Sequence, residues 1–245
     1  MPVVGVIGAG QLARMMQPAA IGLGVRLRVL AARADESAAQ VIPDTVLGRH
    51  DDMAAVRAFA RGCDVVTFDH EHVPAEILER VVQDGVPVRP GAGALVHAQD
   101  KAVMRERLSA LGLPCPDWRR VKNAADVADF AKDTTGWPVI LKATRGGYDG
   151  KGVWRVAGAD QASLVVEGAV ERGVELIAEQ LMPFQRELSV VAVRGRDGEF
   201  RTWPLTENWH DHGILSASLA PATVDAAIAE KAIAHARAVA AQGAR

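Results

Sequence analysis

The run GGYDGKG occupies residues 146–152 and directly follows the apolar segment VILK at residues 139–142, which is typical of a β-strand. Its four glycines lack the Cβ atoms that keep a backbone away from a ligand, and they tolerate positive φ. Several amide N–H groups can therefore converge on one anion, with the charges of Lys142 and Lys151 on either side. The run is typical of a loop that closes over phosphates. An ordinary glycine-rich hairpin turn is the alternative that the run alone leaves open.

A Walker A loop is the nearest competing motif, and the sequence does not fit it. That motif needs a glycine ahead of the Gly-Lys pair and a hydroxyl residue directly after the lysine, whereas Arg145 and Gly152 hold these positions. The following VWRV at residues 153–156 is typical of a strand rather than a helix. We therefore expect two antiparallel strands whose connecting loop is a mobile lid, with its own amides and lysines holding the anion.

The composition indicates a soluble, folded protein. The chain has 245 residues, of which 49% are hydrophobic, and this length suits one large domain or two modest ones. A net charge of −2 provides no broad basic surface for nucleic acid. No apolar run approaches the ~18 residues of a membrane-spanning helix, and no export signal precedes the first motif. We expect a cytoplasmic protein that binds neither nucleic acid nor membrane, with Cys63 and Cys115 as buried thiols.

Strands and helices alternate along the first part of the chain. The predicted strands are Val3–Ile7, Arg26–Leu30, Val65–Phe68 and Val86–Val88, and the predicted helices are Leu12–Leu23, Met53–Gly62 and Ala75–Asp84. This alternation predicts a parallel sheet with helices on both faces.

The pattern changes near His97, where we place a domain boundary. A long helix is predicted at Ala98–Leu111, and Gly112 to Pro116 stop it. The further predicted elements are helices at Ala124–Asp133, Ala159–Arg172 and Val224–Ala241, a strand at Glu175–Glu179, and strands at Leu188–Val193 and Phe200–Leu205 joined by a turn at Arg196–Gly198.

A second glycine motif, Gly8-x-Gly10-x-x-Ala13, lies between the first predicted strand and helix and matches the dinucleotide fingerprint. The fingerprint also expects an acidic residue about 20 positions further on, at the end of the second strand, but that end has the sequence Leu30-Ala31-Ala32-Arg33. An NAD(P) site is therefore one interpretation. Binding of another phosphate-bearing substrate by Gly8, Gly10 and Gln11 is a second, and tight helix–sheet packing is a third.

Polar side chains follow the strand at residues 65–68, at the sheet edge where open α/β folds place ligands. Asp69, His70, Glu71 and His72 form this run. Two histidines two positions apart with no further ligand nearby favour a polar loop over a metal site, and Glu71 is the candidate for a substrate contact.

Further along the chain, Glu179 to Met182 follow a buried strand and precede Pro183 and Phe184, as in a connection between two lobes. Backbone groups of such a segment can bracket an adenine edge, although a purely structural strand end fits as well. Glu187 is placed to accept hydrogen bonds from ribose hydroxyls. His210 lies in a polar and aromatic run that is equally compatible with a solvated turn.

Taken in order, the glycine loop, Glu179-Gln180, Glu187 and the run Thr206 to His210 resemble the ATP-grasp enzymes. More narrowly, the chain resembles the 5-(carboxyamino)imidazole ribonucleotide synthases of purine biosynthesis. The matching residues are Gly8, Gly10, Gln11, Leu12, Arg14 and Met15, the run 146–152, Glu179, Gln180 and Glu187, and Pro204 to Asn208 followed by His210 and Gly213 to Leu215. Gly-Gln-Leu separates this family from NAD enzymes, and Tyr148 and Asp149 separate it from most other ATP-grasp members.

This resemblance implies the fold class. An α/β ATP-grasp protein has an N-terminal Rossmann-like, pre-ATP-grasp parallel-sheet domain followed by an α+β ATP-binding region. We expect the first domain at residues 1–96, a linker helix and the ATP-grasp lid subdomain at 97–181, and the start of the second lobe at 182–245.

The resemblance also implies the activity. ATP phosphorylates bicarbonate to carboxyphosphate, and the exocyclic amine of 5-aminoimidazole ribonucleotide is then carboxylated, leaving ADP and phosphate. Such phosphoryl transfer is mostly positioning and charge stabilisation, so no covalent protein nucleophile is assigned. The family implies magnesium as a cofactor and a homodimer.

By position in the family, the expected ATP contacts are Lys101, Lys142, Gly147, Tyr148, Asp149, Gly150, Lys151, Gly152, Val153, Glu179, Gln180, Leu181, Met182, Glu187 and His210. The expected contacts to the aminoimidazole ribonucleotide are Gly10, Gln11, Glu71 and Tyr148.

The sequence departs from the family at its end. Family members continue with a magnesium-binding glutamate, an Asn-Glu pair and basic residues for the substrate phosphate, and these would lie beyond Arg245. We therefore expect no metal ligands in this chain, and a 245-residue protein that binds nucleotide weakly without turnover. An NAD(P)-dependent oxidoreductase and a non-catalytic nucleotide-binding module stay open as alternatives.

Overall fold

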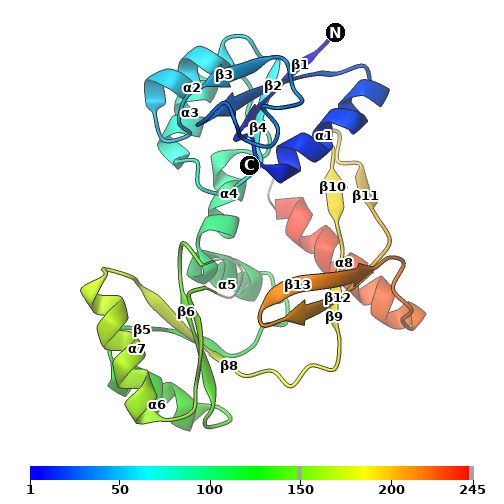
Figure 1. Ribbon diagram of the computed structural model, residues 1–245. Coiled ribbons are helices and arrows are strands. Elements are labelled where there is room, and N and C mark those ends of the chain that lie inside the picture. The colour runs from blue at the N-terminus through cyan, green and yellow to red at the C-terminus, as the bar shows by residue number, and fades with distance from the viewer. Residues whose placement is uncertain (148–150, 243–245) are drawn as a thin grey trace. The chain divides into compact units, whose positions relative to one another are not determined.

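The computed structural model describes residues 1–147 and 151–242 (Figure 1). The chain divides into two compact units, Met1–Ala98 and Gln99–Arg245, and each is described by itself. The predicted further division at residues 181 and 182 stays a prediction.

The first unit is built around a parallel sheet with the strand order β3-β2-β1-β4 (Figure 1). Its strands are β1 (Val3–Ile7), β2 (Arg26–Ala31), β3 (Thr45–Leu47) and β4 (Val65–Phe68). The helices that alternate with them are α1 (Gln11–Gly22), α2 (Met53–Ala60) and α3 (Ala75–Gln83), and α4 (Ala92–Gln99) follows at the end of the unit. The predicted alternation is therefore confirmed.

Neighbouring residues of one strand enter separate cores, because successive strand side chains point to opposite faces. Val6 of β1 packs with Ala13 of α1, whereas Ile7 packs with Phe59 of α2 and Leu78 of α3. All five of these apolar side chains are buried, and helices cover both sides of the sheet. The prediction of helices on both faces is confirmed.

Three local predictions in this part of the chain were wrong. β3 was not expected, because its three residues give no periodicity. The predicted strand Val86–Val88 is reduced to one bridge between Val66 and Val88. The single helix expected at Ala98–Leu111 is instead α4 followed by α5 (Lys101–Ala110), since the extended residue Asp100 interrupts it and caps α5 through the amides of Ala102 and Val103.

The second unit contains an antiparallel sheet with the order β5-β8-β6-β7. Its strands are β5 (Trp118–Val121), β6 (Val139–Ala143), β7 (Val153–Val156) and β8 (Leu176–Gln180), and α6 (Ala124–Asp133) and α7 (Ala159–Glu171) pack on it. The predicted pairing of β6 with β7 is confirmed. β5 was missed because its two exposed arginines, Arg119 and Arg120, break the apolar pattern.

Strand alternation gives this sheet two different faces. Leu141 of β6 and Ala178 of β8 enter the core beneath α6 and α7, together with Phe130 and Val166. The next residue along each strand, Lys142 in β6 and Glu179 in β8, therefore points to the opposite face.

The rest of the second unit forms a sheet of three strands, a strand pair and a helix. The sheet has the order β13-β12-β9, with β9 (Glu187–Ser189), β12 (Thr206–Asp211) and β13 (Ile214–Leu219). β10 (Ala192–Arg194) pairs with β11 (Phe200–Thr202), and Arg237 of α8 (Ala226–Gln242) lies 4.5 Å from the centre of the Phe200 ring.

Two strand predictions here were wrong in extent. The strand expected at Leu188–Val193 is divided between β9 and β10, and the one expected at Phe200–Leu205 ends at Thr202. The β12–β13 hairpin was not predicted as such; its turn consists of His212 and Gly213, both with positive φ, as in the tight turns that favour hairpins.

Two smaller features complete the fold. Cys63 and Cys115 are free and half-buried, where buried thiols were expected, and burial raises the pKa of Cys63 above its ordinary value. Within residues 1–147 and 151–242, no helix is both long and apolar enough to cross a membrane.

Candidate functional site

The glycine loop is held at both ends by the β6–β7 hairpin. Lys142 lies opposite Val153, and the amide of Ala143 donates to the carbonyl of Gly152 at 2.8 Å. Gly146 and Gly152 both have a φ of +72°, so the positive φ expected of the loop is present at its two ends. Tyr148, Asp149 and Gly150 lie outside the described residues.

The first turn of α5 brings Lys101 to the loop. The backbone amide of Lys101 donates to the carbonyl of Thr144 at 2.9 Å, which ties the helix to the end of β6. A Cβ atom added to Gly147 would lie 3.4 Å from the Lys101 Nζ and 2.8 Å from the Lys151 carbonyl oxygen. The glycine therefore lets the backbone approach the ammonium group closely. Two predicted contacts that are distant in sequence, Lys101 and Gly147, are neighbours here.

Glu179 lies between two cations on the face of the sheet opposite α6 and α7. Its Oε2 accepts a hydrogen bond from Lys142 Nζ at 2.6 Å, and its Oε1 accepts one from Arg105 Nε at 2.7 Å. Only 4% of the Glu179 side chain is exposed. Burial raises the pKa of Glu179, but the hydrogen bonds and charges of Arg105 and Lys142 outweigh burial and hold this pKa below its ordinary value.

Arg105 was missed in the sequence. It is four positions after Lys101 in α5, so both side chains lie on one side of the helix. This spacing was the signal available, because the helix predicted at Ala98–Leu111 already places positions 101 and 105 on one side. Asp100 and Arg145 form a second ion pair beside the loop, at 3.0 Å, that was not predicted either.

The segment after β8 runs without regular structure to β9. Leu181 is half-buried, whereas Met182 and Phe184 are exposed. The amide of Gln180 already donates to the carbonyl of Asp117 at 2.9 Å. The Gln180 N–H is one of the backbone groups predicted to contact an adenine, and it therefore already has an acceptor within the protein.

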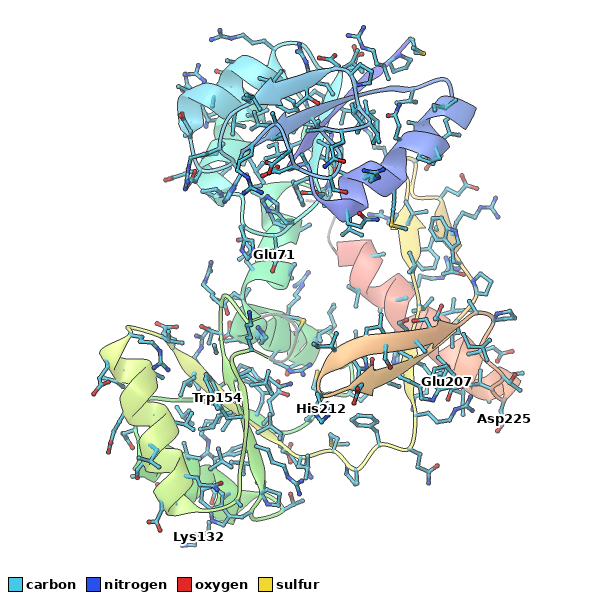
Figure 2. The ribbon with its side chains drawn as sticks, in the orientation of Figure 1. Glu71, Lys132, Trp154, Glu207, His212 and Asp225 are labelled. Carbon is cyan, nitrogen blue, oxygen red and sulfur yellow. The ribbon has the colours of Figure 1, made fainter. Side chains whose placement is uncertain are left out.

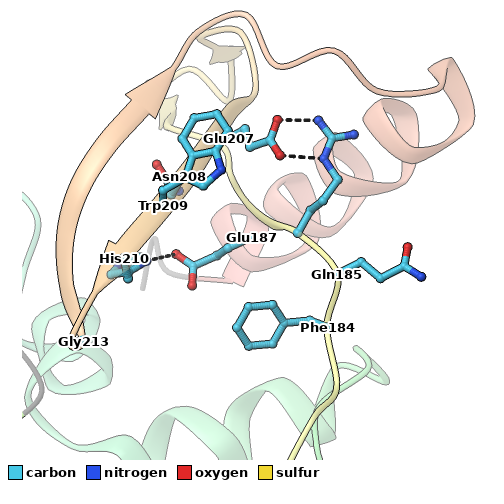
Figure 3. A pocket seen from close by; sticks show the side chains of 9 residues that line it. Phe184, Gln185, Glu187, Glu207, Asn208, Trp209, His210 and Gly213 are labelled. Carbon is cyan, nitrogen blue, oxygen red and sulfur yellow. Dashed lines mark hydrogen bonds and ion pairs between the residues drawn. The ribbon is translucent and has the colours of Figure 1, made fainter.

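A pocket of about 450 Å³ opens between the segment before β9 and the strand β12 (Figure 3). Glu187 Oε1 lies 3.4 Å from His210 Nδ1 inside it. Glu187 pairs with Asn208 across the two strands, so His210, two residues on, is placed on the same side. The pairing of β12 with β13 shifts register between Trp209 and His210, an irregularity that often re-aims a side chain beside a functional site. The structure thus brings two predicted contacts together.

Arg186 and Glu207 form a bidentate ion pair along the wall of this pocket, and neither was predicted as a contact (Figure 3). Arg186 Nε donates to Glu207 Oε1 at 2.6 Å, and Arg186 Nη2 donates to Oε2. The hydrogen bonds from Arg186 lower the pKa of Glu207. The pair joins the residue before β9 to β12, next to the position where Glu187 lies opposite Asn208.

The glycine turn of the first unit contains a carboxylate. Asp69 Oδ2 accepts a hydrogen bond from the amide of Gly10 at 2.7 Å, and a Cβ atom added to Gly8 would lie 1.8 Å from Asp69 Oδ1. Gly8 has a φ of +107°, so it suits the turn for a second reason. The Asp69 side chain is 4% exposed, and Oδ1 has no hydrogen-bond partner among the described residues. A negative charge thus occupies the place where the dinucleotide fingerprint would put a phosphate.

The position of the Asp69 carboxylate argues against two interpretations of the glycine motif, an NAD(P) site and a site for another phosphate-bearing substrate. A phosphate bound at the start of α1 would have to replace or approach the Asp69 carboxylate, which is unfavourable because like charges repel. The Gly10 amide is already bonded, and Gln11 Oε1 accepts a hydrogen bond from Ser37 Oγ at 2.9 Å. The NAD(P) site therefore lacks support from the geometry, and tight packing of the glycine turn is what the structure contains.

His70, which follows β4, lies against two other histidine rings, edge-on to His50 and tilted to His72. The ring centres of His70 and His50 are 4.7 Å apart, and those of His70 and His72 are 5.5 Å apart. Burial lowers the pKa of His70 below its ordinary value. Glu71 lies in the same loop, half-buried and near His72 (Figure 2).

Within residues 1–147 and 151–242, no three or more His, Cys, Asp and Glu side chains are grouped so that they could hold a metal ion. The described residues therefore do not fit a magnesium site.

Two family models match the chain in succession. The Ribonucleotide synthetase preATP-grasp domain matches residues 1–99, and the ATP-grasp domain matches residues 106–242. The N5-carboxyaminoimidazole ribonucleotide synthase of Corynebacterium ammoniagenes is 49% identical over 222 residues, covering 91% of this chain and 54% of the relative. The enzyme of that name from Mycobacterium tuberculosis is 45% identical, with 90% and 51% covered. The chain spans about half the length of the curated relatives it matches.

Solved structures agree with the sequence relatives. An ADP complex of an N5-carboxyaminoimidazole ribonucleotide synthetase superposes with a TM-score of 0.89 at 30% identity, covering 98% of this chain and 63% of the other. The synthase of Aspergillus clavatus in complex with ADP and 5-aminoimidazole ribonucleotide gives 0.88 at 32% identity, with 98% and 62% covered. The predicted resemblance and the predicted fold class are confirmed. With a pre-ATP-grasp unit followed by an ATP-grasp match over more than half of its length, the chain belongs to the ATP-grasp family.

Proposed function

We propose that this protein takes part in the ATP-dependent carboxylation of 5-aminoimidazole ribonucleotide. The γ-phosphoryl group of ATP is transferred to bicarbonate, which gives carboxyphosphate and ADP. The exocyclic amine then attacks the carboxyl carbon, loses a proton and releases inorganic phosphate. The names of the relatives and the ligands of the Aspergillus clavatus complex support this reaction.

The observation that carries the proposal is the group of cations at the glycine loop. Lys101 lies against Gly147, and Lys142 lies at the end of β6 that leads into the loop. Charge spreads over the phosphoryl oxygens during transfer, so lysines and loop amides stabilise the reaction without a covalent intermediate on the protein. We assign to ATP the contacts expected from the sequence: Lys101, Lys142, residues 147–153, Glu179 to Met182, Glu187 and His210.

The pocket beside β12 supports a nucleoside site. Glu187 offers acceptor oxygens for ribose hydroxyls, and His210 lies 3.4 Å away, where it orients that carboxylate. Phe184 adds an exposed aromatic face to the same pocket, suited to packing against a base.

For 5-aminoimidazole ribonucleotide the assignment rests on Glu71, with Gln11 and Tyr148 as further candidates. We assign Gly10 to the shape of the turn at this site, because its amide already donates a hydrogen bond to Asp69. The family resemblance implies bicarbonate as a substrate and magnesium as a cofactor, although the described residues offer no group of ligands for the metal. We also place the protein in the cytoplasm and expect a homodimer, as the family implies.

Calorimetric titration tests this function. We expect ATP and 5-aminoimidazole ribonucleotide each to bind the purified protein, and Lys142→Met to weaken ATP binding by about 30-fold or more, the scale of a hydrogen bond to a charged group. Lys132→Met, which removes an exposed lysine of α6, is the matched control and should leave both affinities unchanged. Binding of NAD(P) with no binding of ATP would instead favour an oxidoreductase.

A further inference from the structure

Both oxygens of the Glu179 carboxylate are already engaged inside the protein. Lys142 Nζ and Arg105 Nε donate to different oxygens, at 2.6 and 2.7 Å, and the carboxylate is 4% exposed. A ligand at this place would have to break an ion pair to reach the Glu179 side chain. The Glu179 side chain is therefore an internal acceptor.

The two cations differ in how far they extend toward solvent. The Lys142 side chain is 24% exposed and comes from the strand that enters the glycine loop, whereas the Arg105 side chain is 16% exposed and comes from α5. Lys142 is thus the cation better placed to meet an anionic ligand, and Arg105 lies on the other side of the shared carboxylate.

The charge of the cluster depends on Arg105. Two cations and one carboxylate give a net charge of +1. Without Arg105, Glu179 and Lys142 would form a neutral pair, and Lys142 would be partly screened from an approaching phosphate. A group of charges as enclosed as this one has a low effective dielectric constant, so a difference of one charge has a large effect on anion binding.

We propose that Arg105 is a positioning residue of the nucleotide site, which holds Glu179 through Oε1 and thereby leaves the positive charge of Lys142 available to the phosphates. This inference rests on the proposed ATP site. It adds a residue that is not itself a ligand contact, and it assigns the Glu179 side chain to the support of Lys142.

The proposal predicts a specific pattern of nucleotide affinities. Arg105→Met should weaken ATP binding about tenfold, because the cluster becomes neutral. Adding Glu179→Gln to that variant restores the net charge of +1, so Arg105→Met/Glu179→Gln should recover most of the lost affinity. If Arg105→Met weakened ATP binding only through lost packing, adding Glu179→Gln would not restore the affinity. Arg105→Lys should stay within about threefold of the wild type, since it keeps the charge.

Calorimetric titration with ATP, supported by thermal unfolding of each variant, measures these affinities. Arg201→Met is the control, because it removes an exposed arginine that pairs with Glu199, two positions away in sequence. ATP binding by Arg105→Met that equals the wild type would overturn the proposal, and so would a double variant as weak as the single one. If Arg105→Met does not fold, Arg105→Gln replaces it, and equal affinities of Arg105→Gln and Arg105→Lys would overturn the charge argument. Absence of ATP binding by the wild type would refute the proposed function instead.

Discussion

The two glycine-rich segments of this protein have the same backbone character and opposite electrostatics. In the first unit, the turn at Gly8 and Gly10 encloses the Asp69 carboxylate, whose Oδ1 has no partner among the described residues. In the second unit, the loop that begins at Gly146 lies beside Lys101 and Lys142. Glycines allow close approach in both places, but the neighbouring side chains decide whether an anion can be the group that approaches.

Two buried carboxylates, Glu179 near the loop and Asp69 in the turn, show the same difference. Glu179 and Asp69 are each 4% exposed on the side-chain atoms. Glu179 is satisfied by two cations, whereas Asp69 has one amide hydrogen bond and a histidine Nε2 at 4.0 Å. We therefore expect the two residues to respond very differently to substitution.

The largest expected effect is that of Glu179→Met on stability. The substitution leaves Arg105 and Lys142 facing each other without their shared acceptor, and breaking a buried ion pair in this way costs roughly 3–5 kcal/mol. Urea denaturation monitored by tryptophan fluorescence measures the loss. A cost below about 1 kcal/mol would show that the cluster contributes little to the fold.

The same carboxylate makes a pH-dependent contribution. Its pKa is lowered in the folded state, so its stabilisation is present above the unfolded-state pKa and is lost as the pH falls through the folded-state pKa. The stability difference between the wild type and Glu179→Gln should therefore shrink in acid. A difference that stays constant as the pH is lowered through the acid range would contradict this assignment.

A smaller effect is expected for Asp69. Asp69→Ala removes the acceptor of the Gly10 amide at the start of α1 and should cost about 1–2 kcal/mol, the scale of a lost helix cap. Asp69→Asn keeps an acceptor oxygen and should cost less than Asp69→Ala. Thermal unfolding of the two variants separates the hydrogen bond from the charge. Equal losses would mean that the charge, and not the acceptor, holds the turn.

The smallest effect is expected at Gly147. A Cβ atom there would lie 2.8 Å from the Lys151 carbonyl oxygen, so Gly147→Ala forces a small backbone shift at the loop. We expect ATP binding about fivefold weaker, measured by calorimetry. Gly158→Ala is the control, because an added Cβ atom there meets nothing within 4 Å. Unchanged affinity for Gly147→Ala would place the phosphates elsewhere.

Much of the fold could be predicted because it follows from local periodicity. The apolar run Val3–Ile7 and the segment Val139–Ala143 give clear strand patterns, and the failed Walker A positions indicated a hairpin. Elements with weak local signals were missed. β5 has exposed arginines that break its apolar pattern. Asp100 resembles an ordinary polar residue within a helix, and its role as the cap of α5 is evident only in the structure.

The site was predictable in its residue types and not in its pairings. Lys142, Glu179, Glu187 and His210 could be named because they occupy positions that match the family's motifs. The contact of Arg105 with Glu179 and that of Asp69 with Gly10 could not be predicted, because they span 74 and 59 positions of sequence. Such contacts depend on which helix packs against which strand end, and local patterns do not contain that information.

One measurement tests the central claim that the anion site lies at the loop of the second unit and not at the turn of the first. ATP and NADP⁺ are titrated calorimetrically into the wild type, Lys142→Met and Asp69→Asn. We predict that the wild type and Asp69→Asn bind ATP with similar affinity, that Lys142→Met loses about 30-fold or more, and that NADP⁺ does not bind the wild type. ATP binding that survives in Lys142→Met, or NADP⁺ binding by the wild type, would contradict the account.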